Sequence, residues 1–168
     1  EKRIGHAGTL DPMATGVLVL GVGHATRLLS FITDGSKTYV ATIRLGSATN
    51  TDDAQGEIIS VGQPEKIAAI TDLLITQELA KRTGDILQRP SSVSAIKVDG
   101  VRSYKRVRDG EAVELEARPV HVFNQQVEKI SRVDDFIDVE IEVTCSAGTY
   151  IRAIARDLGN TFDVGGHL

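Results

Sequence analysis

Residues 5–16, with the sequence GHAGTLDPMATG, carry the residue types best suited to chemistry in this 168-residue chain. Three glycines in this segment allow left-handed backbone conformations and a close approach to a ligand. His6 and Asp11 lie between them, and a carboxylate held on such a constrained loop can serve as a nucleophile or a general base. Asp11 also has a structural interpretation, because Asp before Pro is typical of an Asx turn or a helix cap, and spacing alone favours that role.

Several other chemistries are excluded by the sequence. No Gly-Lys-Ser/Thr follows the loop, as a Walker phosphate loop requires, and Gly21-Val22-Gly23 lacks the third glycine of a dinucleotide fingerprint. A single cysteine, Cys145, forms no intramolecular disulfide, and no apolar run approaches the ~20 residues of a membrane span. The histidines offer no metal-ligand spacing: His6, His24, His121 and His167. We therefore expect a protein of a reducing, cytoplasmic compartment, with no metal site and no membrane segment.

The charge is divided along the chain. Taken globally, the net charge of −4 and the pI of 5.6 argue against a nucleic-acid partner. Residues 81–110 nevertheless carry +5 and residues 1–44 carry +2, whereas residues 45–80 and 111–144 carry −5 and −6. The +5 segment also contains serines and Tyr104, a combination suited to following a phosphate backbone. Its alternative role is a solvated face that acidic neighbours neutralise.

The elements that must hold these residues form an α+β fold with a mixed, largely antiparallel sheet and flanking helices. Alternation over residues 37–45 predicts a half-buried strand, and residues 56–61 are expected to pair near it. Two further strands are predicted over residues 120–130 and 136–145, with Asp134-Asp135 as the turn between them. A short apolar run over residues 17–22 predicts a buried strand.

Helical spacing and turn signals complete the expected fold. Asp99-Gly100 is a strong hairpin signal, and Gly159 is expected to end the last helix. The predicted helices cover residues 25–32, 64–79, 102–108 and 150–158.

Residues 5–18, GHAGTLDPMATGVL, resemble the catalytic motif of the TruB family of tRNA pseudouridine synthases in its bacterial form. Lys37-Thr38-Tyr39 resembles the second active-site segment of that family. Residues 90–110, with Ser-Ala-Ile-Lys at 94–97, resemble its RNA-gripping insertion, and residues 145–152, CSAGTYIR, resemble its third motif. These motifs occur in the order of the family and cover nearly the whole chain, so the resemblance is specific.

The resemblance implies the pseudouridine synthase fold and the isomerisation of uridine to pseudouridine in the T-loop of tRNA, without a cofactor. Asp11 corresponds to the essential aspartate of the family, and Arg152 to the arginine that pairs with it. The chemical role of Asp11 stays open between attack on the base, attack on the sugar and removal of the 2′ proton. Tyr39 corresponds to the tyrosine that stacks on the target base, with core packing as its alternative role. Arg152 has the alternative of a surface helix arginine.

The resemblance also implies how RNA is bound. His6 corresponds to a residue that helps hold the flipped nucleotide, and Tyr150 is expected to line the same pocket. The T-arm of tRNA would be gripped by the insertion, through the side chains Lys97, Arg102, Tyr104, Arg106 and Arg108. Val93 departs from the family, many members of which carry an aromatic residue there.

The resemblance places the whole chain, residues 1–168, in a catalytic domain shortened at both ends. The insertion covers about residues 88–118, and a C-terminal RNA-binding domain is absent. No obligate protein partner is expected. Three alternatives remain: a guide-RNA-dependent pseudouridine synthase, a non-catalytic RNA-binding module, and a phosphate-loop or hydrolase enzyme built on residues 5–16.

Overall fold

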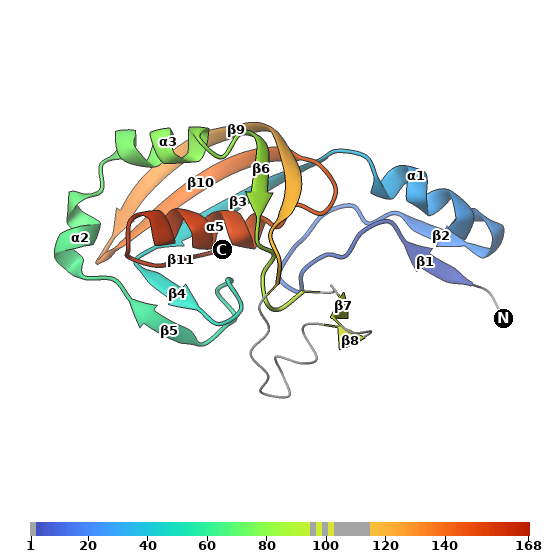
Figure 1. The fold of residues 1–168 in the computed structure, drawn as a ribbon, viewed down its shortest axis with the longest axis horizontal. Coiled ribbons are helices and arrows are strands. Elements are labelled where there is room, and N and C mark those ends of the chain that lie inside the picture. Colours follow the sequence, from blue (N-terminus) through green and yellow to red (C-terminus); the bar gives the residue numbers. More distant parts are fainter. Residues whose placement is uncertain (1–2, 95–96, 99–100, 103–114) are drawn as a thin grey trace. The chain divides into compact units, whose positions relative to one another are not determined.

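The computed structural model describes residues 3–94, 97–98, 101–102 and 115–168. The chain divides into two compact units, Glu1–Lys37 and Thr38–Leu168 (Figure 1). Each unit has its own secondary structure, and each is described by itself below.

The first unit is an antiparallel hairpin with a short helical segment on one face. Strands β1 (Ile4–His6) and β2 (Leu20–Val22) pair, and the 3₁₀ helix η1 (Gly23–Leu28) leads into α1 (Leu29–Thr33). Gly5 and Gly21 lie opposite each other in the hairpin. A Cβ atom at either position would come within 3.0 Å of the Leu29 side chain. The two glycines therefore provide the flat surface on which Leu29 packs.

The buried strand predicted over residues 17–22 is wrong in both length and burial. Only Leu20–Val22 is a strand, and the side chains of Leu20 and Val22 are 60% and 51% exposed. Side chains alternate between the two faces of a strand, so only the glycine positions meet Leu29. The helix predicted over residues 25–32 is present as η1 followed by α1.

The second unit is built on a five-stranded sheet with the order β11-β3-β10-β9-β6. Its pairs β10–β9, β6–β9 and β11–β3 are antiparallel. Thr38 contacts Thr144 and Arg44 contacts Asp138, so β3 and β10 also run in opposite directions. The strands are β3 (Lys37–Leu45), β6 (Gly84–Gln88), β9 (Arg118–Val133), β10 (Phe136–Cys145) and β11 (Gly166–His167). This confirms the α+β fold with an antiparallel sheet.

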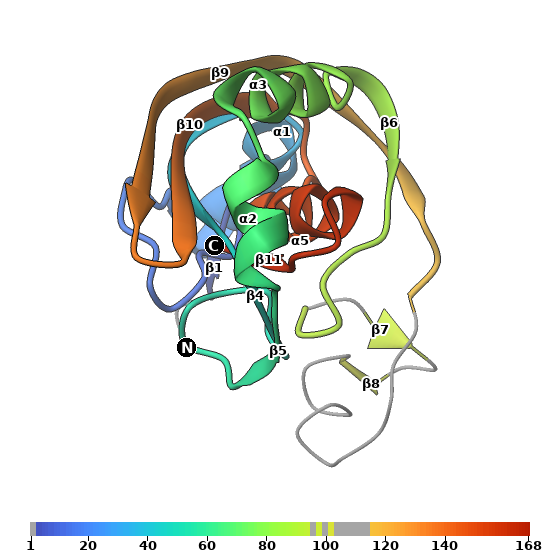
Figure 2. The same ribbon diagram turned by 90° about the vertical axis from the view of Figure 1, so that its left-hand side faces the viewer.

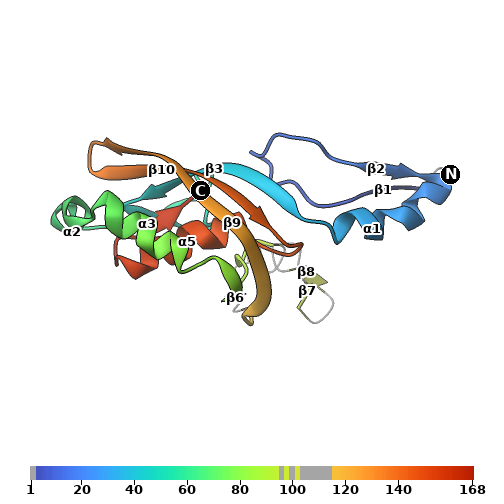
Figure 3. The same ribbon diagram turned by 90° about the horizontal axis from the view of Figure 1, so that it is seen from above.

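The sheet curls around the helix α5 (Ile151–Thr161), as Figure 2 shows. The pairing of β9 with β10 shifts register at Glu140/Ile141 and Thr144/Cys145. Such bulges bend a strand and increase its twist, and β9 is visibly bent along its length in Figure 3. The curl provides a concave face in which α5 is buried.

The core forms because alternate strand residues face this helix. The alternation predicted for residues 37–45 is confirmed: Ile43 and Leu45 are fully buried, and Tyr39 packs at the edge of the same cluster. Ile154 and Leu158 of α5 complete the contact. Full burial contributes about 1.5–3 kcal/mol for each such aliphatic side chain.

Two small hairpins lie outside the sheet. β4 (Ser47–Thr49) directly follows β3 and pairs with β5 (Ile58–Val61), which agrees with the expected pairing of residues 56–61 near β3. β7 (Lys97–Val98) pairs with β8 (Val101–Arg102), which confirms the hairpin predicted around Asp99-Gly100. Residues 103–108 of the predicted basic helix lie outside the described residues.

The single helix predicted over residues 64–79 is two helices, α2 (Pro64–Ala69) and α3 (Asp72–Ala80). Thr71 adopts an extended conformation, and its hydroxyl accepts a hydrogen bond from the Leu74 amide. This is the bond of an N-cap residue, which satisfies an amide that the helix start leaves unpaired. The apolar spacing continues through the break, which is why periodicity alone missed it.

Gly159 does not end the last helix as predicted. It lies inside α5, which continues to Thr161. A Cβ atom on Gly159 would come within 2.2 Å of the backbone of Gly165 and Gly166. Glycine is required here because the segment leading into β11 crosses the helix at backbone distance.

This close approach predicts that Gly159→Ala destabilises the protein by about 3 kcal/mol, because the added methyl group must displace the backbone of residues 165–166. The sign is diagnostic, since Gly to Ala in a helix interior otherwise stabilises by about 1 kcal/mol. Urea unfolding would measure the difference. Asn160→Ala, at the next and exposed position of α5, is the control and should stay within about 0.5 kcal/mol of the parent. Equal stability of Gly159→Ala and the parent would contradict the packing argument.

Candidate active site

The predicted site residues are divided between the two units. Asp11 and His6 belong to the first unit, whereas Tyr39, Tyr150 and Arg152 belong to the second. The structure brings Tyr150 and Arg152 together at the start of α5. The ion pair between Asp11 and Arg152 stays a prediction.

Asp11 is half-buried in the loop of residues 7–19 that joins β1 to β2. The Ala7 amide donates to the Val19 carbonyl at 2.9 Å and closes the base of this loop. The Asp11 carbonyl accepts from the Ala14 amide at 2.9 Å, so residues 11–14 form a tight turn with Pro12 at its second position. This turn is made by the main chain of Asp11, whereas the expected Asx turn or helix cap would use its carboxylate and stays a prediction.

His6 lies on β1 at the entrance to the same loop and is exposed. Its Nδ1 donates to the Gly8 carbonyl. This bond requires a proton on Nδ1, because a carbonyl oxygen only accepts. The imidazole is thereby oriented by its own loop.

Tyr39 is half-buried on β3 and packs against the hydrophobic core of the second unit. Its alternative role, core packing, is therefore present. Tyr39 also lies near the start of β3, and a half-buried aromatic side chain there suits stacking. Stacking on a base stays a prediction.

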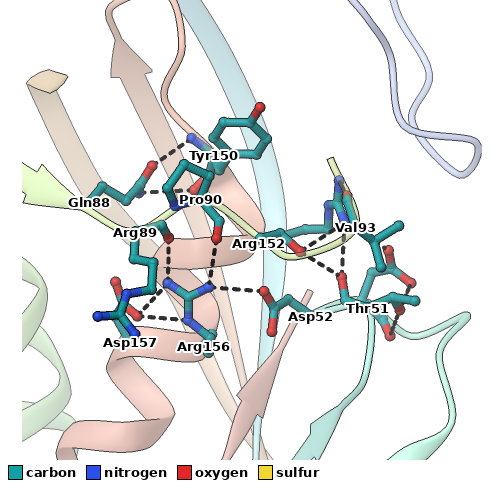
Figure 4. A network of polar contacts seen from close by, with 12 residues as sticks. Thr51, Asp52, Gln88, Arg89, Pro90, Val93, Tyr150, Arg152, Arg156 and Asp157 are labelled. Atoms are coloured by element: carbon teal, nitrogen blue, oxygen red, sulfur yellow. Dashed lines mark hydrogen bonds and ion pairs between the residues drawn. The ribbon is translucent and has the colours of Figure 1, made fainter. Parts of the chain in front are cut away.

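Arg152 is a buried residue, only 5% exposed, so the alternative of a surface arginine is wrong. Its Nη1 donates to the Thr51 carbonyl at 2.9 Å and to Ser91 Oγ at 3.3 Å (Figure 4). Its Nη2 donates to the Val93 carbonyl at 3.1 Å. The Asp53 carboxylate lies 3.6 Å from Nη1. A buried guanidinium needs such partners, because an unpaired charge in the interior is very costly.

Sequence reasoning missed Asp52 and Asp53, which it counted only as part of the acidic segment of residues 45–80. Asp53 is 6% exposed and accepts from Thr51 Oγ1 at 2.7 Å and the Gln55 amide at 3.0 Å. Asp52 has a φ of 61° and directs Oδ2 to within 3.1 Å of Arg156 Nη1. Two adjacent acids with two arginines a helical turn apart were the available signal.

Arg156 lies one turn beyond Arg152 on α5 and holds the backbone that enters the insertion. Its Nη2 donates to the Arg89 carbonyl at 2.6 Å, and its Nη1 donates to the Pro90 carbonyl at 3.5 Å. We name residues 88–93 the strap, because Gln88, Arg152 and Arg156 together tie it to α5 (Figure 4). The strap places the root of the insertion directly beside Arg152.

The predicted RNA-binding residues of the insertion are only partly described. Lys97 and Arg102 lie opposite each other in the β7–β8 hairpin. Tyr104, Arg106 and Arg108 lie outside the described residues. Elsewhere in the +5 segment, Lys81 and Arg82 form ion pairs with Glu78 at 2.5 and 3.5 Å. These two cations are engaged by the protein itself.

The described part of the chain offers neither a metal-binding cluster nor a membrane-spanning helix. Among the described residues, no three His, Cys, Asp or Glu side chains gather closely enough to hold a metal ion. No helix in that part of the chain has the length and apolar character needed to cross a membrane.

Comparison with known proteins gives consistent matches over the whole chain. Residues 1–151 match the family model described as TruB family pseudouridylate synthase (N terminal domain). The chain is 53% identical to the tRNA pseudouridine synthase B of Corynebacterium diphtheriae and 58% identical to that of Paenarthrobacter aurescens. These matches cover 99% of this chain and 56% and 53% of the two relatives. The chain thus spans about half the length of these curated relatives.

Solved structures match over 98% of this chain. A Cbf5-Nop10-Gar1 complex matches with a TM-score of 0.65 and 27% identity, over 37% of its chain. An H/ACA RNP bound to a substrate RNA containing 2′-deoxyuridine matches with a TM-score of 0.62 and 25% identity, over 36% of its chain.

Two carboxyls of the second unit, those of Asp52 and Asp138, predict opposite pH dependence for their Asn variants. Burial raises the pKa of Asp52, although Arg156, Ser91 and Arg152 act to lower it. The folded state therefore holds this proton more tightly than the unfolded chain, and the contribution of Asp52 to stability falls as the pH rises above about 4. Asp52→Asn keeps the left-handed conformation and an oxygen toward Arg156. The stability of this variant relative to the parent should therefore rise as the pH is raised from about 4 to 7, because the parent alone loses the contribution of the protonated carboxyl.

Asp138→Asn is the matched variant with the opposite sign. The hydrogen bonds from Arg44 hold the pKa of the Asp138 carboxyl below its usual range. Its contribution is present at neutral pH and is lost as the pH falls below about 4. Because the pair is partly exposed, Asp138→Asn should cost about 0.5–1 kcal/mol at pH 7 and much less at pH 3. Urea unfolding from pH 3 to 7 measures both, and changes of the same sign in the two variants would contradict the assignment.

Proposed function

Because the chain belongs to the TruB family of pseudouridylate synthases, we propose that it carries catalytic residues of an enzyme that isomerises uridine to pseudouridine in the T-loop of tRNA. The relatives at 53% and 58% identity, named tRNA pseudouridine synthase B, support tRNA as the substrate. Since the chain spans about half of their length, the activity is proposed for the full natural protein.

The reaction is an exchange of bonds within one nucleotide. The bond between N1 of uracil and C1′ of ribose breaks, and a bond between C5 and C1′ forms. The C5 proton leaves to solvent, and N1 gains a proton, so atoms and electrons balance without a donor or an oxidant. The work left to the protein is to expose the base, stabilise charge and move protons.

The observation that carries the proposal is the burial of Arg152 at the position where the family has its aspartate-pairing arginine. Three side-chain and carbonyl partners and Asp53 hold the guanidinium in one place. A fixed guanidinium favours the ionised form of a facing carboxyl and orients it. All three possible roles of Asp11, attack on the base, attack on the sugar and removal of the 2′ proton, require that ionised form.

The remaining site residues would receive the flipped nucleotide. Removing a base from its stack costs a few kcal/mol, which aromatic stacking on Tyr39 would offset in part. Tyr150, at the start of α5, would line the same pocket. His6, whose ring is oriented by Gly8, would hold the nucleotide in its extruded position.

The T-arm of the tRNA would be gripped by the insertion. A-form RNA is recognised through its backbone and shape rather than through its base edges. We assign this contact to Lys97, Arg102, Tyr104, Arg106 and Arg108, in the segment with a net charge of +5. In bacteria tRNA is found in the cytoplasm, and the proposal places the enzyme there.

We further propose that the enzyme acts on tRNA without a guide RNA or an obligate protein partner. The relatives named as tRNA pseudouridine synthase B are 53–58% identical, whereas the chain matched in the Cbf5-Nop10-Gar1 complex is 27% identical. The chain is therefore much more similar in sequence to these relatives than to the chain in that complex.

The proposal predicts that the full protein releases tritium from unmodified tRNA transcript labelled at C5 of uridine, with no guide RNA present. Asp11→Asn should lower the single-turnover rate by roughly a thousandfold or more, because an amide cannot act as nucleophile or base. Binding of tRNA by this variant, measured by filter retention, should stay within about threefold of the parent.

Asp34→Asn is the matched control, because Asp34 is an exposed carboxylate of the same unit. It should keep the parental rate. Near-parental turnover by Asp11→Asn would refute the mechanism. Tight tRNA binding without release of label by the parent would favour the RNA-binding module instead, and activity only with a guide RNA would favour the ribonucleoprotein enzyme.

The contact of Asp53 with Arg152 predicts a second kinetic effect. Asp53→Asn removes the carboxylate charge beside the buried guanidinium, so Arg152 keeps its three hydrogen bonds but loses its buried counter-charge, and the rate should fall about 10- to 100-fold. Asp52→Asn, which alters the contact to Arg156 instead, should change the rate by less than about threefold. The single-turnover assay measures both, and equal rates for the two variants would contradict a specific role of Asp53.

A further inference from the structure

Gln88 has an unusual pair of contacts at the end of β6. It is only 2% exposed. Its Nε2 donates to the Tyr150 carbonyl at 3.1 Å, and its Oε1 accepts from the Tyr150 amide at 2.8 Å (Figure 4). The side-chain amide of Gln88 thus hydrogen-bonds both the N–H and the C=O of Tyr150, in the way that the backbone of a neighbouring β-strand would.

The contact lies where the chain turns into α5. Tyr150 is the residue before the helix, has extended dihedrals of −104° and 111°, and makes no side-chain cap hydrogen bond. Its carbonyl is the first acceptor of the helix, since it also receives the Ala153 and Ile154 amides. Gln88 therefore fixes the peptide groups on both sides of the Tyr150 Cα, and with them the direction in which its ring leaves the backbone.

The same contact bears on Arg152, two residues further along. The first turn of α5 is set by its entry residue, and Arg152 lies in that turn. The strap contacts of Arg152 and Arg156 engage guanidinium groups at the ends of long side chains. Gln88 differs from them, because it acts on the backbone from which both Tyr150 and Arg152 project.

We propose that Gln88 is a positioning residue of the active site: its amide holds the backbone of Tyr150 so that the Tyr150 ring receives the target uridine and the Arg152 guanidinium is directed to the catalytic carboxylate. The inference rests on the proposed function, since it takes Tyr150 and Arg152 as site residues. It predicts a defect in the chemical step rather than in stability alone.

Gln88→Glu tests this in the full natural protein, because it changes one hydrogen-bonding group and little else. The carboxylate still accepts from the Tyr150 amide but faces the Tyr150 carbonyl with a second acceptor. A protonated carboxyl restores the donor, and at a site this buried its pKa is raised well above the usual value. The single-turnover rate should be about tenfold below the parent at pH 8 and return to within about twofold near pH 5.5.

The charged groups around Gln88 are common to parent and variant, so the ratio of the two rates isolates the new carboxyl. Among the described residues they include Glu78, Lys81, Arg82 and Asp157, which border the same hollow as Gln88, Arg118, which is paired with Gln88 between β6 and β9, and Arg89, the next residue of the chain. Gln88→Met, which removes both hydrogen bonds, should lose about tenfold at every pH. It serves as the second variant should Gln88→Glu fold poorly at high pH.

Gln125→Glu is the matched control. The Gln125 Nε2 also donates to a backbone carbonyl at 3.1 Å, that of Leu79 at the end of α3. The same chemical change there should lower the melting temperature and leave the single-turnover rate within twofold of the parent at both pH values.

The outcomes separate the two claims. A parent that releases no label overturns the proposed function, and this inference with it. An active parent with Gln88→Glu at the parental rate across the pH range overturns the inference alone, even where the melting temperature falls. Acid-restored turnover in Gln88→Glu, absent from Gln125→Glu and from Gln88→Met, supports it.

Discussion

The burial of the Arg152 guanidinium is the constraint on which the second unit depends. Removing a cation from water costs several kcal/mol unless fixed partners replace the lost solvation. Those partners come from the segment after β4 and from the strap, which lie about 100 and about 60 residues from Arg152 in the chain, respectively. The two segments meet where the Ser91 hydroxyl donates to the Thr51 carbonyl at 3.3 Å, and their common contact with the arginine reinforces that junction.

The core beneath this cluster holds α5 in place, which allows the helix to present a buried guanidinium. The helix is buried on the concave face of the sheet, and Gly159 lets the segment before β11 cross it at backbone distance. A helix fixed on several sides loses little further entropy when its polar groups are ordered. The position of Arg152 is therefore determined by packing first and by hydrogen bonds second.

The sequence was informative wherever the signal was local. Alternation located β3 and β10, and Asp99-Gly100 located the β7–β8 hairpin. The sequence-based prediction failed where a contact with another segment determines the local structure. The break at Thr71 depends on a single capping hydroxyl, and Gly159 serves a crossing segment rather than a helix end. The apolar run before Val22 stays exposed because a two-stranded hairpin has only one covered face.

The site divides in the same way. Asp11 and Arg152 stand in motifs that the sequence displays, whereas Asp52, Asp53 and Gln88 acquire their meaning from partners at least 60 residues away. No periodicity marks Gln88, and the spacing of Arg152 and Arg156 was the only sequence signal for the two adjacent acids, because such polar side chains are ordinarily solvated.

The ion pairs also change what the net charge of each segment implies for RNA binding. Asp52 and Asp53 turn inward to two arginines of α5, and Lys81 and Arg82 are paired with Glu78. Glu78 offsets the charge of one of the two cations beside it, and the two aspartates balance the two arginines of α5. Such clusters contribute little field beyond the Debye length of about 8 Å. Lys81 and Arg82 therefore attract a phosphate backbone less strongly than the net charge of +5 over residues 81–110 suggests.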